Sequence, residues 1–224
     1  MRTRKIFCVL IILLFIVSIG TVVFAKTKLK KLDYDNYVET SLYYLLPEDE
    51  YKSMYDFDSI AVHDSVDDLS NLLPYTDAIL IVTPVDDPEF VGNGILNNCK
   101  IKKVVEGKDF REDQVIEIYD FVAWWKMSDT AYLNGSTPLN ESNDYIVFIR
   151  KAPRPNKKDT YIYSSIPYGH IKISDSIDVL ENYDAATITV KQAMNYQFIF
   201  GNNTNPTLVD LYKKNCEQLI SKYK

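Results

Sequence analysis

Between Leu73 and Arg150, apolar residues gather in short runs separated by turn-forming residues, a pattern that predicts the strands of a sheet. Uninterrupted apolar runs at Asp77–Thr83 and Asp144–Arg150 predict strands that are buried on both faces. Apolar and polar residues alternate at Ile95–Val105 and Gln114–Phe121, which predicts strands with one buried face. A fifth strand is expected at Tyr161–Ser164. Five short strands of this kind predict a small β-barrel.

Helical spacing precedes and follows these strands, so the predicted fold class is mainly β with flanking helices (α+β). Ser65 and Asp68 have the spacing of a capping box, and the apolar positions around them predict a short helix that ends at Pro74. Asn205 as N-cap and Pro206 at the first helical position predict a final amphipathic helix that docks on the barrel. The apolar face of this final helix contains Leu208, Leu211, Tyr212, Cys216, Leu219, Ile220 and Tyr223.

The N-terminus predicts a membrane-targeting segment. Three basic residues precede an uncharged apolar run at residues 6–25, which Lys26 closes. If the run is not cleaved, it is long enough to anchor the chain in a membrane. If the sequence Val23-Phe24-Ala25 is a cleavage site, the run is instead a signal peptide. Both alternatives place the rest of the chain outside the cytoplasm, either membrane-anchored or secreted.

These patterns divide the chain into four parts. Residues 1–31 form the signal peptide or membrane anchor with a basic tether, and residues 32–64 form an extension. Residues 65–173 form the barrel, and residues 174–224 form a C-terminal helical extension that packs on it. Two weaker patterns predict short helices, one with Tyr37, Leu42, Tyr44 and Leu45 on one face and one containing Ile177 and Leu180.

Charge and cysteine content limit the possible partners. Three of the 25 basic residues and none of the 31 acidic residues lie in residues 1–25, so the remainder has 22 basic against 31 acidic residues and a net charge of -9. This charge disfavours nucleic acid as a partner. Beyond the targeting segment only Cys99 and Cys216 remain, and they form either one disulfide or two buried thiols.

The order of residues along the strands resembles a known family. The resemblance is carried by Thr76-Asp77-Ala78-Ile79-Leu80-Ile81-Val82, Val104-Val105-Glu106-Gly107, Thr137-Pro138-Leu139, Asp144-Tyr145-Ile146-Val147-Phe148-Ile149, Tyr161 and Gly169-His170-Ile171. These residues look like those of uncharacterised secreted or membrane-anchored proteins of Gram-positive bacteria. The domain of those proteins is an OB-like barrel similar in shape to the N-terminal domain of tissue metalloproteinase inhibitors. The resemblance covers Ser65 to Ile173 and implies a five-stranded barrel at the cell surface, with no assigned catalytic residue.

Inhibition of a metalloprotease is not expected from this resemblance. Those inhibitors have a cysteine at the mature N-terminus, whereas cleavage here exposes Lys26. Catalytic chemistry is also not indicated. The sequence contains no Gly-x-Ser-x-Gly elbow, and its two histidines, His63 and His170, do not have the spacing of metal ligands. We therefore predict no catalytic residue, no metal and no cofactor, and keep a hydrolase that uses His63 or His170 as an alternative.

Adjacent tryptophans are the most distinctive feature of the chain. Trp124 and Trp125 lie in Ala123–Asn143, which is longer than an ordinary connection and is interpreted as a functional loop. OB-like barrels bind ligands on the face of their second and third strands and in the neighbouring loops. The predicted ligand-binding residues are therefore Trp124, Trp125 and Tyr119, and the predicted function is an extracytoplasmic binding module for an unknown protein, peptide or glycan. A structural accessory domain of a membrane complex is the other alternative.

Overall fold

The computed structural model describes residues 37–45, 69–70, 72–86, 88–91, 94–120, 123–125, 130–133, 135–152, 160–181, 183, 188–201 and 204–224. The chain divides into two compact units, Met1–Asp33 and Tyr34–Lys224, and every described residue belongs to the second unit. The predicted targeting segment at residues 6–25 and His63 lie outside the described residues. Among the helices that are described, none is long and apolar enough to cross a membrane.

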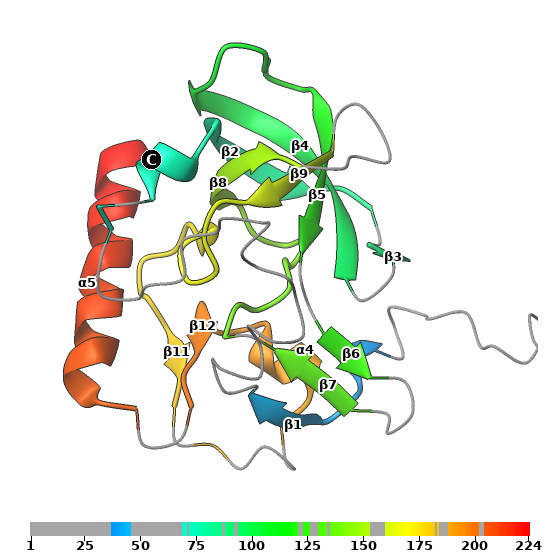
Figure 1. Ribbon diagram of the computed structural model, residues 1–224, viewed down its shortest axis with the longest axis vertical. Helices are drawn as coiled ribbons and strands as arrows, with labels where there is room; N and C mark the ends of the chain where they lie inside the picture. The colour runs from blue at the N-terminus through cyan, green and yellow to red at the C-terminus, as the bar shows by residue number, and fades with distance from the viewer. Residues whose placement is uncertain are drawn as a thin grey trace, which may run out of the picture. The chain divides into compact units, whose positions relative to one another are not determined.

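Five strands close into a barrel, as the sequence predicted (Figure 1). They are β2 (Ala78–Pro84), β4 (Gly94–Glu106), β5 (Val115–Asp120), β8 (Tyr145–Lys151) and β9 (Thr160–Tyr163). Around the barrel the order is β2, β4, β5, β9 and β8, and β8 pairs with β2 to close the ring. All neighbouring strands are antiparallel except β5 and β9, which run parallel. This is the strand order of an OB-like barrel.

The two strands with uninterrupted apolar runs are buried on both faces, which confirms their interpretation. Side chains of successive strand residues point to opposite faces. In β2, Leu80 and Val82 therefore pack in the barrel core, whereas Ile79 and Ile81 pack in a second core outside the barrel wall. Strand β8 alternates in the same way, with Tyr145, Val147 and Ile149 inside and Ile146 and Phe148 outside.

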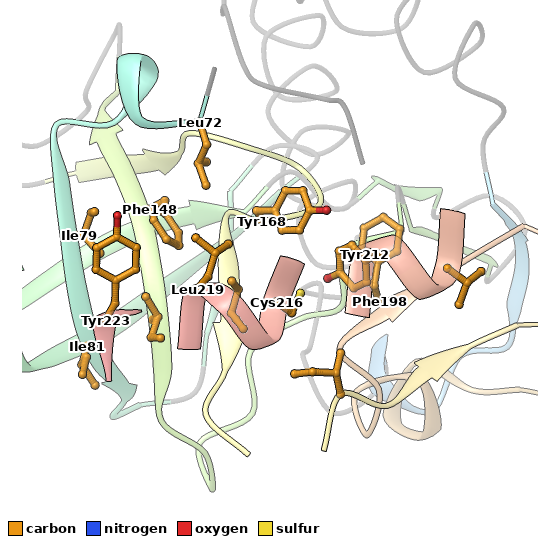
Figure 2. Close-up of a cluster of buried hydrophobic side chains, with 14 of the residues drawn as sticks. Leu72, Ile79, Ile81, Phe148, Tyr168, Phe198, Tyr212, Cys216, Leu219 and Tyr223 are labelled. Atoms are coloured by element: carbon orange, nitrogen blue, oxygen red, sulfur yellow. The ribbon is translucent and has the colours of Figure 1, made fainter. Parts of the chain in front are cut away.

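Helix α5 (Pro206–Tyr223) covers the outer residues of β2 and β8, as predicted for the final helix (Figure 1). It begins where the side chain of Asn205 accepts a hydrogen bond from the Thr207 backbone N–H at 3.0 Å. Figure 2 shows Tyr223 and Leu219 of this helix directed toward the sheet. The rings of Tyr223 and Phe148 meet edge to face with centroids 5.7 Å apart. The helix is therefore part of the fold and supplies one wall of its outer core.

Cys99 and Cys216 are free thiols in the structure, so the disulfide that the sequence left open between them is not formed. Cys99 lies in the barrel core. Cys216, a residue of α5, lies in the outer core between this helix and the sheet (Figure 2). Each belongs to a different apolar cluster, and burial raises the pKa of both thiols to about 12. The second alternative, two buried thiols, is the one that the structure contains.

The last barrel position is occupied by two strand segments instead of one. β9 and β10 (His170–Lys172) both pair antiparallel with β8, β9 near its end and β10 near its beginning. Between them the chain leaves the sheet and returns at Gly169, whose backbone O accepts a hydrogen bond from Phe148 N at 2.9 Å. A Cβ at Gly169 would lie 2.2 Å from Ser165 O, so only glycine fits this return. Beyond Gly169 the sheet continues in β10, which contains Ile171.

The connection between β2 and β4 carries a short additional strand, β3 (Glu89–Val91), which pairs with the beginning of β4. Before β2, the described part of the predicted first helix contains a 3-10 turn, η2 (Leu73–Tyr75), while Ser65 and Asp68 lie outside the described residues.

A second group of elements packs beside the barrel end. It contains β1 (Leu42–Leu45), β6 (Ala123–Trp125), β7 (Thr130–Leu133), β11 (Val179–Leu180), α4 (Val190–Ala193) and β12 (Phe198–Ile199). β1, β7 and β6 form one small sheet, and β11 pairs with β12 in another. The short helices predicted around Leu42 and Leu180 are therefore wrong, because both segments pair with a distant strand and tertiary pairing overrides local spacing.

Candidate functional site

The outer face of β4 and β5 is the barrel surface on which OB-like barrels bind ligands. Three cross-strand pairs lie opposite each other there: Leu96 with Tyr119, Asn98 with Glu117, and Lys100 with Val115. Their neighbours Cys99, Ile116 and Ile118 are buried in the barrel core, so these six side chains belong to the opposite face. Each of the six is half-buried or exposed, and Val115 is 50% exposed.

Several polar groups of this face are already held in place. The Tyr119 hydroxyl donates a hydrogen bond to Val91 O at 2.9 Å, and its ring fills the space beside Gly94, where a Cβ would lie 2.4 Å from Tyr119 Cζ. The Thr160 hydroxyl donates to Glu117 Oε2 at 3.0 Å. The predicted site residue Tyr119 therefore lies on this face with a fixed hydroxyl and a half-buried ring.

Trp124 and Trp125 lie in β6, which follows β5 after two residues. In the register of β6 and β7, Trp124 is opposite Ala131 and Trp125 is opposite Thr130. The interpretation of Ala123–Asn143 as a loop is thus wrong in part, because the segment contains a β-hairpin. The positions of the two tryptophan side chains lie outside what the structure describes. β6 belongs to the small sheet with β1 and β7, whereas Tyr119 lies in β5 of the barrel, so the structure places the two tryptophans and Tyr119 in different sheets that follow each other in the chain.

A second cluster lies inside the barrel. Asn97 on β4, Asp120 on β5, Tyr145 on β8, Tyr163 on β9 and His170 on β10 are all at most 6% exposed, and we call these five residues the barrel polar layer. The His170 ring lies between two tyrosine rings, with centroid distances of 5.6 Å to Tyr145 and 5.1 Å to Tyr163. The Tyr145 hydroxyl accepts a hydrogen bond from Asn140 N at 2.8 Å.

The titratable members of this layer are strongly perturbed. Burial lowers the pKa of His170 to about 4, even though a hydrogen bond with the Thr137 backbone opposes this shift. Burial also raises the pKa of Asp120 to about 7 and that of Tyr163 well above its ordinary value. The layer as a group was not predicted. A signal for it exists in the strand alternation. Asn97 is two residues from Cys99 and Asp120 is two residues from Ile118, so each polar side chain lies on the same strand face as a core residue.

An open surface cavity of about 710 Å³ lies at the barrel end where the β4–β5 turn meets β8 and β9. Its lining combines acidic and basic side chains with aromatic rings and contains Asp77, Glu106, Lys108, Phe110, Lys151 and Tyr161.

Within the described parts of the chain, no three His, Cys, Asp or Glu residues gather closely enough to hold a metal ion.

Comparison of the chain with protein-family models, curated proteins and solved structures found no match. The class of protein that the fold defines is therefore a mainly β domain with a closed five-stranded OB-like barrel and a C-terminal helix.

Proposed function

We propose that this chain is a non-enzymatic, extracytoplasmic binding module whose ligand lies across the outer face of β4 and β5 and the adjoining β6. The observation that carries the proposal is the unequal covering of the barrel wall. The outer residues of β2 and β8 are buried beneath α5, whereas those of β4 and β5 remain half-buried or exposed. A face with an exposed valine and prearranged polar groups is suited to a ligand that offers both apolar surface and hydrogen bonds.

The ligand class follows from charge and aromatic content. The net charge of -9 outside residues 1–25 disfavours polyanions such as nucleic acid. Trp124 and Trp125 adjoin the face in the chain, and tryptophan gives a large contact area to sugar rings and to peptide side chains. A glycan or a peptide is therefore the proposed ligand.

The extracytoplasmic location is part of the proposal and rests on the apolar run at residues 6–25. In this proposal an uncleaved run ties the binding module to a membrane, and a cleaved run releases it.

The hydrolase alternative loses support from the surroundings of His170. Its imidazole is 3% exposed and lies between two tyrosine rings, so a substrate has no access to it in this arrangement. His63, the other histidine, lies outside the described residues. The structural accessory domain remains the second candidate, favoured by the apolar run that would join it to a membrane complex.

The proposal is tested by binding of the full chain to an oligosaccharide array and to a peptide array. We expect at least one ligand, with an affinity that falls tenfold or more, about 1.4 kcal/mol, on Trp124→Ala, Trp125→Ala or Asn98→Ala. Tyr75→Ala is the matched control, because Tyr75 is an exposed aromatic residue on η2, before the first barrel strand.

Two results would overturn the proposed function. One is the absence of binding to either array by a chain that is folded by circular dichroism. The other is a ligand whose affinity is the same in all three site variants, or falls equally in Tyr75→Ala.

A further inference from the structure

The barrel polar layer holds an acid in surroundings that do not compensate its charge. Asp120 is the last residue of β5 and lies opposite Ile95 of β4. Asn97, two residues further along β4, lies opposite Ile118 on the same face. On the other side of Asp120, the parallel pairing of Tyr119 with Ile162 places Tyr163 beside this aspartate. The carboxylate is 2% exposed, and its Oδ2 has no hydrogen-bond partner among the described residues.

Besides Asp120, the strands that line the barrel interior contribute uncharged groups to the barrel polar layer or beside it. β4 contributes Asn97 and the Cys99 thiol, β8 and β9 contribute the phenols of Tyr145 and Tyr163, and β10 contributes the imidazole of His170. The raised pKa values of the thiol and the phenols, and the lowered pKa of His170, keep all of these groups neutral near pH 7. None of these described neighbours offers a cation, so an ionised Asp120 would be a buried charge without a counterion.

Orphaned hydrogen-bonding atoms concentrate at the same place. Besides Asp120 Oδ2, the atoms Asn97 Nδ2, Tyr163 OH and His170 Nδ1 are buried without a partner among the described residues. Native proteins rarely leave such groups unpaired, so several together identify a polar site inside the barrel. A proton is the smallest ligand that suits a carboxylate in these surroundings.

We propose that the barrel polar layer is a proton-binding site, in which the Asp120 carboxylate, buried in the barrel and unpaired at Oδ2 among the described residues, takes up one proton from solvent. The step forms an O–H bond on Asp120 and removes one negative charge from the barrel interior. This charge lies at the end of β5, the strand that leads into β6. This inference is independent of the proposed ligand face.

The two titrating residues act on stability in opposite directions. The pKa of Asp120 is raised from 3.8 to about 7, so its contribution is fully present at low pH and is lost as the pH rises through that window. The pKa of His170 is lowered from 6.5 to about 4, so its contribution is fully present above pH 6.5 and is lost as the pH falls toward 4. Between about pH 4 and 6.5 the two slopes oppose each other, and the intact chain has a shallow stability profile.

The direct test is the titration of the Asp120 side-chain carboxyl carbon, followed by NMR in the full-length wild-type chain. The expected midpoint lies near pH 7, and a midpoint near the ordinary aspartate value of about 4 would overturn the proposal. This measurement needs no variant, so it decides the question even where a substitution prevents folding.

The second test compares the pH dependence of the thermal midpoint in four full-length chains. In Asp120→Asn only the titration of His170 should remain, so the thermal midpoint should rise as the pH increases from 4 to 6.5. In His170→Gln only the titration of Asp120 should remain, so the thermal midpoint should fall as the pH increases from 4 to 7. The double variant should be level across this range. Asp109→Asn removes an exposed carboxylate and is the control for charge alone, with a profile parallel to that of the wild type. If the Asp120→Asn profile is parallel to the wild type, the carboxyl of Asp120 does not bind the proton.

Discussion

The imidazole of His170 packs against the phenol of Tyr163 with ring centroids 5.1 Å apart, although the chain leaves the sheet between the two residues. Tyr163 ends β9 and His170 begins β10, and both strands pair with the same edge of β8. The excursion at residues 164–169 therefore divides one barrel position into two halves that remain in contact through their side chains. Gly169, where the chain returns, is the residue on which this contact depends.

Substitution of this glycine should be severe. Gly169→Ala would bring a Cβ to 2.2 Å from Ser165 O and 2.5 Å from Tyr163 Cβ, and a backbone oxygen cannot move away cheaply. We expect a loss of about 3 kcal/mol in the free energy of unfolding, measured in urea. Lys214→Ala on the exposed side of α5 is the control. A loss below about 0.5 kcal/mol would show that the excursion adapts.

The docking of α5 can be tested with two adjacent residues of opposite exposure. Leu219 is 7% exposed in the outer core, whereas Gln218 is exposed. Leu219→Ala should cost about 3 kcal/mol because it leaves a cavity against the sheet, and Gln218→Ala should change stability by less than about 0.5 kcal/mol. Equal effects in urea unfolding would mean that the helix does not dock by this face.

The two buried thiols should be inert in the folded chain. Burial raises the pKa of Cys99 and Cys216 to about 12, so almost no reactive thiolate is present near pH 7. We expect iodoacetamide to modify neither residue under native conditions and both in urea, as measured by peptide mass spectrometry. Recovery of a Cys99–Cys216 cross-linked peptide without reductant would contradict the separation of the two cores.

Asp144 provides a pH effect of the opposite sign to that of Asp120. Burial raises the pKa of Asp144, but hydrogen bonds from Lys102 and Thr83 outweigh it and leave the pKa below 3.8. Lys102 Nζ lies 2.8 Å from each carboxylate oxygen. The stability that this pair contributes is present above pH 3.8 and is lost as the pH falls below it.

Asp144→Asn should therefore be less stable than the wild type at about pH 7 and equal to it at about pH 2. The measurement is the free energy of unfolding of both chains in urea at the two pH values. Lys191 and Glu39, an exposed pair joined at 2.9 Å, supply the control Glu39→Gln, for which we expect a small effect at both pH values. A difference for Asp144→Asn that persists in acid would assign the effect to packing instead of charge.

The candidate sites differ in how far the sequence could predict them. Tyr119 and the two tryptophans were predicted because they are conspicuous residues near one another in the chain. The barrel polar layer was missed because Asn97, Asp120 and His170 are far apart in sequence and meet only when β4, β5 and β10 are side by side. A buried aspartate also looks like an ordinary solvent-facing strand residue until the register is known.

The sequence by itself determined the five barrel strands and the final helix, since burial on one or both faces leaves its period in the order of residues. It predicted β2 and β8 because each is buried between two cores, and α5 because Asn205, Pro206 and one apolar face occur together. Only the tertiary structure decided the pairing of β8 with β9, the excursion before Gly169 and the separation of Cys99 from Cys216. These features depend on which distant segments meet, and local periodicity contains no information about that choice.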